Sequence, residues 1–269
     1  MKVQGKVLVV TGGGSGMGRE LVFNLLNKGA KVFAVDINEK TLQETVQLAG
    51  DKKENLATAV LNVADKAAVD ALPAKVIEKF GAVDGIINNA GIIQPFVRLK
   101  DLDFSAIERV INVNLYGVIY MTKAFLPHLL TRPTAHVANV SSMGGYLPVP
   151  GQTIYGATKA AVKLMTEGLY AELLETNVNV TLIYPGAIAT NITTNSGVAT
   201  PGGTQTQEQE QKFKSLPADQ AAEIIVNAIE KDSYSVFVGS DAKFMNLICR
   251  LSPQRATKFI YNQMKSLLK

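Results

Sequence analysis

The chain has 269 residues, of which 47% are apolar and 19% charged, a composition that excludes a disordered chain and allows one large domain or two small ones. No apolar run reaches the ~18 residues of a transmembrane helix, and the first one, at 7–10, is too short for a secretory signal. One Cys and two His exclude an internal disulfide and a Cys/His zinc site. We therefore expect a globular, cytoplasmic protein without a metal.

The net charge of +4 is concentrated at the end of the chain. Residues 241–269 contain six basic residues and one acidic residue, which gives +5, so residues 1–240 carry −1. A nucleic-acid-binding domain presents its basic residues as a patch or stripe over the fold. We therefore expect no nucleic-acid partner.

Short runs rich in Val, Ile and Ala alternate along the chain with longer segments of helical periodicity. Strands that are apolar throughout are typical of a parallel sheet covered by helices on both faces. With no linker-like stretch and no internal repeat, the pattern predicts a single α/β domain over 1–269 with a seven-stranded parallel sheet. In chain order, the expected elements are strand 6–10, helix 18–28, strand 31–35, helix 39–49, strand 56–61, helix 67–80, strand 85–87, helix 103–130, strand 136–140, helix 155–175, strand 178–183, helix 217–230 and strand 235–238.

A polar stretch at 191–211, rich in Thr, Gln, Gly and Asn, interrupts the alternation. It is either a mobile functional loop or a disordered insertion. Its position after the carboxyl end of a strand, where open α/β sheets bind their ligands, favours a substrate loop at about 190–216.

The basic tail predicts two amphipathic helices at about 241–268, with a break at Ser252-Pro253. We expect them to pack on the body of the protein or on a neighbouring subunit. Peripheral contact with an anionic membrane surface is the alternative, since basic amphipathic helices also bind such surfaces. The two apolar stripes consist of Phe244, Leu247, Ile248 and Leu251, and of Ala256, Phe259, Ile260, Met264 and Leu267.

A glycine cluster follows the first expected strand and opens the first helix. Gly12, Gly16 and Gly18 are spaced G-x-x-x-G-x-G. Glycine permits positive φ and the close approach of a pyrophosphate, and the N–H groups of a helix amino terminus bind anions. An ordinary glycine-rich turn is the alternative.

Asp36 stands at the end of the second expected strand, eighteen residues after the last of these glycines. A carboxylate in this position can accept the hydroxyls of an adenosine ribose and would repel a 2′-phosphate. Neither Ser15 nor Ile37 is basic. The sequence therefore predicts NAD in preference to NADP.

A second constellation combines Tyr155 and Lys159, which lie four apart on one face of an expected helix. A free phenol has a pKa of about 10, and a neighbouring ammonium together with an oxidised nicotinamide would stabilise the phenolate. Such a pair predicts general acid–base chemistry, although Y-x-x-x-K also arises by chance on helices.

Ser142, after a strand end, can polarise a carbonyl or hold an alcohol. We expect Asn88 to satisfy backbone groups, and Asn114 to have a mixed role.

These motifs, in this order and spacing, resemble the short-chain dehydrogenase/reductase family over about residues 5–190. The resemblance implies a three-layer, doubly wound Rossmann-type fold and hydride transfer between a nicotinamide and a carbonyl or secondary alcohol carbon. It also implies a homo-oligomer, either a tetramer or a dimer. The matching motifs are Thr11-x-x-x-Gly-x-Gly, Asn88-Asn89-Ala90-Gly91, Asn114, Ser142, Tyr155-x-x-x-Lys159 and Pro185-Gly186.

The same resemblance implies roles for single residues. Tyr155 is the expected general acid/base, and Lys159 lowers its pKa and binds the nicotinamide ribose. Ser142 binds the substrate oxygen, and Asn114 holds a water for proton exchange. Asn62 stands where the family usually has an aspartate for the adenine. The residues expected to contact NAD are Gly12, Ser15, Gly16, Met17, Gly18, Asp36, Asn62, Val63, Asn89, Ala90, Gly91, Tyr155, Lys159, Pro185, Gly186, Ile188 and Thr190.

Substrate specificity is expected from Gln94, from 143–152 and from the loop at 191–211, which would close as a lid. The rim at 145–150 is apolar and offers no cationic clamp, which predicts a neutral or largely apolar alcohol or ketone. The leading hypothesis is an NAD-dependent dehydrogenase or reductase. A non-catalytic NAD-binding sensor or scaffold is the alternative, although a binder has no need of four catalytic residues. Epimerase- or dehydratase-like relatives usually need additional chain for a substrate domain.

Overall fold

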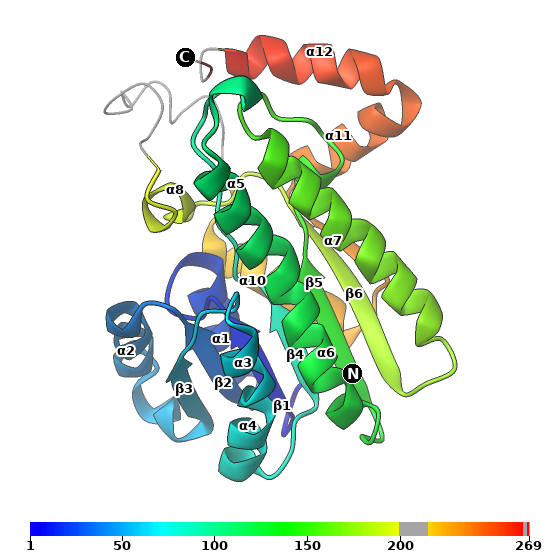
Figure 1. Cartoon of the computed structure of the whole chain (residues 1–269). Coiled ribbons are helices and arrows are strands. Elements are labelled where there is room, and N and C mark those ends of the chain that lie inside the picture. The colour runs from blue at the N-terminus through cyan, green and yellow to red at the C-terminus, as the bar shows by residue number, and fades with distance from the viewer. Residues whose placement is uncertain (199–214, 266–267, 269) are drawn as a thin grey trace.

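The computed structural model describes residues 1–198, 215–265 and 268. Its strands are β1 (Val7–Thr11), β2 (Lys31–Asp36), β3 (Leu56–Val60), β4 (Gly85–Asn88), β5 (Ala135–Val140), β6 (Val178–Pro185) and β7 (Ser235–Val238). They form one seven-stranded sheet in the order β3-β2-β1-β4-β5-β6-β7 (Figure 1), and every neighbouring pair is parallel. The predicted doubly wound, Rossmann-type α/β fold is therefore confirmed. The strand order reverses between β1 and β4, which is where such folds bind ligands.

Three helices cover one face of the sheet: α1 (Gly16–Asn27), α2 (Glu39–Leu48) and α10 (Ala218–Glu230). Leu21 and Leu25 of α1 are fully buried, as are Ile225 and Ile229 of α10. Each pair is spaced by four residues, so each helix presents one apolar stripe to the sheet. This packing fixes the position of α1, whose first turn carries the glycine loop.

The opposite face is covered by α3 (Lys66–Asp70), α4 (Leu72–Phe80), α6 (Gly117–Leu129) and α7 (Thr153–Glu172). Phe125 and Leu129 of α6 are fully buried in the core on this side. The helix predicted at 67–80 is divided into α3 and α4. Pro73 lies in the first turn of α4, where a missing N–H is tolerated.

The long helix predicted at 103–130 is interrupted in the middle. It consists of α5 (Phe104–Ile111), a π-helical segment (Asn112–Tyr116) and α6. Segments of π-helix are rare and occur frequently at functional sites. Asn114 lies within this segment and is fully buried.

The basic tail forms α11 (Ser240–Leu251) and α12 (Pro253–Met264), separated at the predicted break. Figure 1 shows both helices at one end of the molecule, above the first turn of α7. The predicted apolar stripes are divided between two environments. Ala256 and Ile260 pack with Leu147 in a small core, whereas Phe244, Leu247 and Leu251 are 57%, 56% and 77% exposed.

The remaining described elements are the 3₁₀ turns Gly50–Asn55, Leu99–Asp101 and Met143–Gly145 and the short helix α8 (Ile192–Asn195). Helix α8 begins the predicted substrate loop, of which residues 199–214 lie outside the described residues, as does Leu267 of the second apolar stripe. None of the described helices is long and apolar enough to span a membrane. Within the described part of the chain, no three His, Cys, Asp or Glu side chains are grouped as a metal site.

Candidate active site

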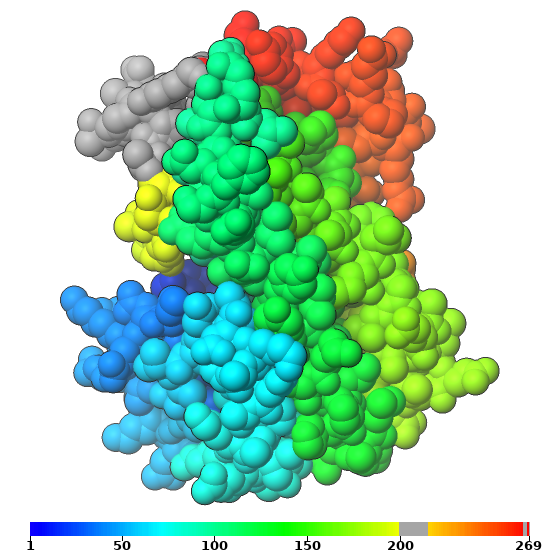
Figure 2. All heavy atoms as spheres, viewed as in Figure 1, coloured from blue at the N-terminus to red at the C-terminus, as the bar shows by residue number. Residues whose placement is uncertain are grey.

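A cavity of about 630 Å³ opens where β1, β2, β3, β4, β5 and β6 end. Every residue predicted to contact NAD lines this cavity, and so does Ser142, whereas Asn114 does not. Figure 2 shows a hollow between α8, in yellow, and the blue region around α2, with dark-blue residues from the start of the chain inside it. The lining also includes polar residues that the motifs did not indicate, namely Asn38, Thr41, Arg109, Asn191, Asn195 and Ser196.

The glycine loop connects β1 to α1 along this cavity. Gly12 and Gly16 have φ of +70° and +50°, in the left-handed region that favours glycine. Gly18 is needed for a different reason, because a Cβ there would collide with the carbonyl oxygen of Gly12. Since α1 begins at Gly16 and its first residues line the cavity, the loop fits a pyrophosphate.

Asp36 presents its carboxylate to the cavity from the end of β2. Oδ2 accepts the N–H of Gly14 at 2.9 Å and Oδ1 accepts the N–H of Asn38 at 3.0 Å. Each oxygen has a further lone pair, so the carboxylate can still accept ribose hydroxyls.

The motifs did not indicate Arg19, a cation close to Asp36, although its place just after the glycine loop was a signal for it. Its Nη2 donates to Glu44 at 3.0 Å.

Thr11, at the end of β1, holds the Asn89-Ala90 segment in place. Its Oγ1 accepts the N–H groups of Asn89 and Ala90, both at 2.9 Å. The Nδ2 of Asn89 donates to the carbonyl oxygen of Thr11, also at 2.9 Å. These bonds fix the segment after β4 against the start of the glycine loop.

Asn88 and Asn114 are both buried but differ in their partners. The prediction that Asn88 satisfies backbone groups is wrong. Its side chain donates instead to the side chains of Asn139 at 2.8 Å and Thr122 at 3.3 Å. The reason is that β4 lies inside the sheet, where the strands on both sides pair with its backbone. Asn114 binds the backbone of Ile92 twice, accepting its N–H at 2.9 Å and donating to its carbonyl at 2.8 Å.

Tyr155 lies in the first turn of α7, next to the Met143–Gly145 turn. A Cβ on Gly144 would be 3.2 Å from Cε1 of the tyrosine ring, so a glycine leaves room for the ring. Burial raises the pKa of the Tyr155 phenol, and a hydrogen bond with Ser142 lowers it. Ser142 Oγ also accepts the N–H of Gly144 at 3.0 Å.

Lys159 lies one turn further along α7, with its Nζ 5.9 Å from the centre of the Tyr155 ring. Its Nζ donates to the carbonyl oxygen of Val140 at 2.9 Å. The residue is only 4% exposed, and burial lowers the pKa of Lys159 to about 8. Ser141 donates to the carbonyl oxygen of Lys159 at 2.8 Å, so the two neighbouring serines hold different parts of α7.

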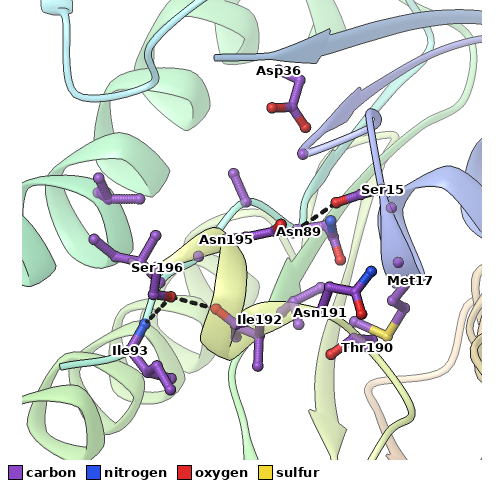
Figure 3. Close-up of a pocket in the computed structure, with 18 of the residues that line it drawn as sticks. Ser15, Met17, Asp36, Asn89, Ile93, Thr190, Asn191, Ile192, Asn195 and Ser196 are labelled. Atoms are coloured by element: carbon purple, nitrogen blue, oxygen red, sulfur yellow. Dashed lines mark hydrogen bonds between the residues drawn. The ribbon is translucent and has the colours of Figure 1, made fainter. Parts of the chain in front are cut away.

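Helix α8 lies over the cavity and contacts the glycine loop. Figure 3 shows Asn195 of α8 beside Ser15, to whose Oγ its Nδ2 donates at 2.8 Å. Ser196 accepts the N–H of Ile93 at 3.0 Å, and its carbonyl oxygen accepts a bond from Arg109 at 2.8 Å. These partners lie between 87 and 180 positions apart, so no local motif could have revealed them.

The segment Pro185-Gly186, at the end of β6, is held from the tail of the chain. Asp241 of α11 accepts the N–H of Ala187 through Oδ2 at 2.8 Å, and a Cβ on Gly186 would collide with this carboxylate. The N–H of Gly186 donates to the carbonyl of Val238 at 2.9 Å. Helix α11 and β7 therefore hold a segment that the sequence predicts to contact NAD.

Gln94 and residues 143–152, which were predicted to form the substrate walls, lie away from the cavity. Gln94 is fully buried, and neither it nor any residue of 143–152 lines the cavity. Leu147 packs against the C-terminal helices, and Tyr146 Oη donates to the carbonyl of Ala242 at 2.7 Å. The side chains of Leu147 and Tyr146 therefore face α11 and α12. The apolar part of the lining comes instead from residues that include Ile92, Ile93, Val113 and Ile192.

A doubly wound sheet with a cavity at its switch point and a glycine loop at the start of α1 defines a Rossmann-type dinucleotide-binding protein. Residues 6–212 match the family model described as short chain dehydrogenase. The chain is 38% identical over 252 residues to SadH, an oxidoreductase by name, of Mycobacterium tuberculosis, and the match covers 92% of this chain and 91% of that protein. The chain belongs to the short chain dehydrogenase family, a class of oxidoreductases that use NAD(H) or NADP(H).

Two solved structures illustrate the likeness. A short chain dehydrogenase/reductase from Burkholderia phymatum in complex with NAD aligns with a TM-score of 0.82 at 27% identity, over 93% of this chain and 96% of that chain. A short chain dehydrogenase from Burkholderia cenocepacia in complex with NADP aligns with a TM-score of 0.80 over 97% and 99%. At 24% identity, this second likeness concerns the fold alone.

Proposed function

We propose that the protein transfers a hydride between NAD(H) and the carbon of a secondary alcohol or ketone. The observation that carries the proposal is that Tyr155, Ser142 and Lys159 line the same cavity as all the predicted NAD contacts. Bound nicotinamide supplies the hydride in reduction and accepts it in oxidation. The glycine loop would hold the pyrophosphate, Asp36 the adenosine ribose, Asn62 and Val63 the adenine, and 185–190 the carboxamide.

In this proposal Tyr155 moves the proton. Its phenol donates a proton to the substrate oxygen during reduction, and its phenolate accepts the proton of the alcohol during oxidation. Tyr155 and Ser142 line the same cavity, which supports a site where both hydroxyls hold one substrate oxygen. The Lys159 ammonium, fixed by the Val140 carbonyl, would stabilise the phenolate.

The decisive variant is Tyr155→Phe, with Tyr116→Phe, a half-exposed tyrosine, as its matched control. Tyr155→Phe should abolish NADH-dependent ketone reduction and leave NADH binding, measured by fluorescence, unchanged. Full turnover by this variant would refute the mechanism. If the wild-type chain binds NADH and turns over no ketone or alcohol, the non-catalytic sensor becomes the better account.

We also propose that NAD is preferred over NADP. The Asp36 carboxylate would repel a 2′-phosphate, and Arg19 is paired with Glu44, so it does not offer an uncompensated positive charge. Steady-state kinetics should give a higher kcat/KM for NADH than for NADPH, and Asp36→Ala should reduce that ratio. A wild-type preference for NADPH would contradict the assignment.

For the substrate we propose a neutral or largely apolar ketone or alcohol. Ile92, Ile93 and Ile192 contribute apolar surface to the cavity, and the guanidinium of Arg109 already donates to the carbonyl of Ser196. A panel should contain cyclic and aliphatic ketones and, as a charged comparison, 2-oxo acids. If a 2-oxo acid gave the highest kcat/KM, the proposed substrate class would be wrong.

We further propose that the chain forms a homo-oligomer through α5 and α7, which lie side by side (Figure 1). Phe104 of α5 and Leu164 of α7 are 80% and 69% exposed, and large exposed apolar residues of this kind mark protein contacts. Light scattering should give a dimer or tetramer, and Leu164→Glu should lower the mass. A monomeric wild type would contradict this.

A further inference from the structure

The loop after β4 joins three parts of the site through three consecutive residues. The backbone of Ile92 is bonded on both sides to Asn114 in the π-helical segment. The N–H of Ile93 is bonded to Ser196, which follows α8. The side chain of Gln94 is bonded to the beginning of α7. The loop therefore lies between the π-helical segment, α8 and the helix that carries Tyr155.

Gln94 caps α7 from a distance in the sequence. Its Oε1 accepts the N–H of Ile154 at 2.8 Å and that of Tyr155 at 3.0 Å, and its Nε2 donates to the carbonyl of Gly151 at 3.0 Å. The N–H groups in the first turn of a helix have no acceptor within the helix. The local N-cap residue, Gln152, makes no capping bond with its side chain. Gln94 supplies the missing acceptor.

The side chain of Gln152 in turn bonds to the backbone of Gln94. Its Nε2 donates to the carbonyl oxygen of Gln94 at 2.7 Å. Gln94 is fully buried and Gln152 is 4% exposed, so water does not readily replace these bonds. Gln152 therefore bonds only to the backbone of the loop, while the Gln94 side chain alone accepts the N–H groups of Ile154 and Tyr155.

The cap is important because Tyr155 lies in the first turn, and helix ends fray. The phenol must keep its place beside Ser142, and Lys159 sits one turn deeper, where the helix is held by its own hydrogen bonds. A displacement of about 1 Å at a reacting group can cost about 100-fold in rate.

We propose that Gln94 is the positioning residue for Tyr155, holding the first turn of α7 so that the phenol stays beside Ser142. This inference rests on the proposed function, in which Tyr155 is the acid/base. Gln94 does not line the cavity, so it acts on the reaction only through the helix.

Three variants test the proposal. Gln94→Leu removes both the acceptor and the donor of the cap. Gln94→Glu keeps an acceptor for both N–H groups but loses the donor to the Gly151 carbonyl. It also places a negative charge beside the first turn, which raises the pKa of the Tyr155 phenol. Gln152→Leu is the matched control, because it removes a buried hydrogen bond from the same loop and leaves the acceptor of Ile154 and Tyr155 in place.

Gln94→Leu should lower kcat by about 10- to 100-fold with the KM for NADH unchanged, using the neutral ketone that the wild type reduces fastest. Gln94→Glu should recover kcat on its pH plateau, with the profile of alcohol oxidation displaced to higher pH. Amide hydrogen exchange at Ile154 and Tyr155 should become fast in Gln94→Leu and remain slow in the other two variants. A merely structural role would lower Tm and kcat in Gln94→Leu and Gln152→Leu alike and would leave the exchange at Ile154 and Tyr155 slow.

The inference is overturned if Gln94→Leu keeps the wild-type kcat, if Gln152→Leu loses as much, or if the two amides stay protected without the Gln94 side chain. Failure of the proposed function has a different signature, because Tyr155→Phe would then be as active as the wild type or no ketone would be reduced. In that case amide exchange, which needs no substrate, still decides whether Gln94 holds the first turn.

Discussion

Replacing Lys159 by Met should make the protein more stable while abolishing its turnover. Burial lowers the pKa of Lys159 to about 8, from 10.5 for the unperturbed side chain. At 1.36 kcal/mol per pKa unit, the charged form is disfavoured by about 3 kcal/mol in the folded protein. Methionine has a similar shape and loses only the hydrogen bond to the Val140 carbonyl, which is worth about 2 kcal/mol for a charged donor. The free energy of unfolding should therefore rise by about 1 kcal/mol at pH 7.

The pH dependence of this gain gives it a distinctive signature. Because the folded pKa of Lys159 lies below the unfolded one, the unfolded chain binds a proton between about pH 8 and 10.5 that the folded chain does not. The stability of the wild type should therefore rise with pH across this window through Lys159, and the methionine variant should lack this contribution. The advantage of the variant is largest below pH 8 and disappears before pH 10.5, because the lost hydrogen bond to Val140 still counts against methionine when the charge penalty is gone.

Denaturant unfolding of the protein without cofactor, at pH 7 and near pH 10, measures this effect, and the Tm at pH 7 should rise by about 2–4 °C. Lys163→Met is the matched control, because Lys163 lies one turn further along α7, is 33% exposed and is paired with Glu167; it should give no gain. The reasoning is refuted if Lys159→Met is less stable than the wild type at pH 7, or if its gain does not change with pH.

Three other outcomes follow from the contacts of the site. Asp241→Ala leaves the N–H of Ala187 without its acceptor, which should lower the free energy of unfolding by about 1–3 kcal/mol and raise the KM for NADH; an unchanged KM would contradict the anchoring role. Ser196→Ala removes the bond to the Ile93 N–H and should raise the KM for the ketone more than that for NADH, and equal effects in steady-state kinetics would argue against it. Since burial raises the pKa of Tyr155, alcohol oxidation should accelerate as the pH rises, whereas a flat pH–rate profile would exclude phenolate as the base.

The buried charge of Lys159 destabilises the folded wild type, and we expect it to be retained because the reaction needs it. A buried ammonium is unfavourable, but its charge is what makes it useful beside a phenol. Proteins often hold such strained or desolvated groups at active sites, and removing them stabilises the fold at the expense of activity. The position of Lys159, buried and bonded to one carbonyl oxygen, agrees with this pattern.

The sequence determined the parts of this protein that depend on local periodicity and on residue chemistry at strand ends. The apolar runs predicted all seven strands, since a strand buried on both faces must be apolar throughout. The order and spacing of the glycine loop, Asp36 and the Tyr155–Lys159 pair resemble the short-chain dehydrogenase/reductase family, and this resemblance implied that they share one site. The structure brings all of them to one cavity.

Only the tertiary structure decided how these groups are held. Gln94 reaches Tyr155 across 61 positions, and Asp241 reaches Ala187 across 54. Neither residue belongs to a local motif, and the sequence placed Gln94 on a substrate wall. A hydrogen bond between distant segments depends on how helices pack on the sheet, and helical periodicity does not encode that packing. The same limit explains why the π-helical segment around Asn114 was predicted as ordinary helix. One extra residue in a helical turn leaves the apolar pattern nearly unchanged, while the side chain of Asn114 turns towards the loop after β4.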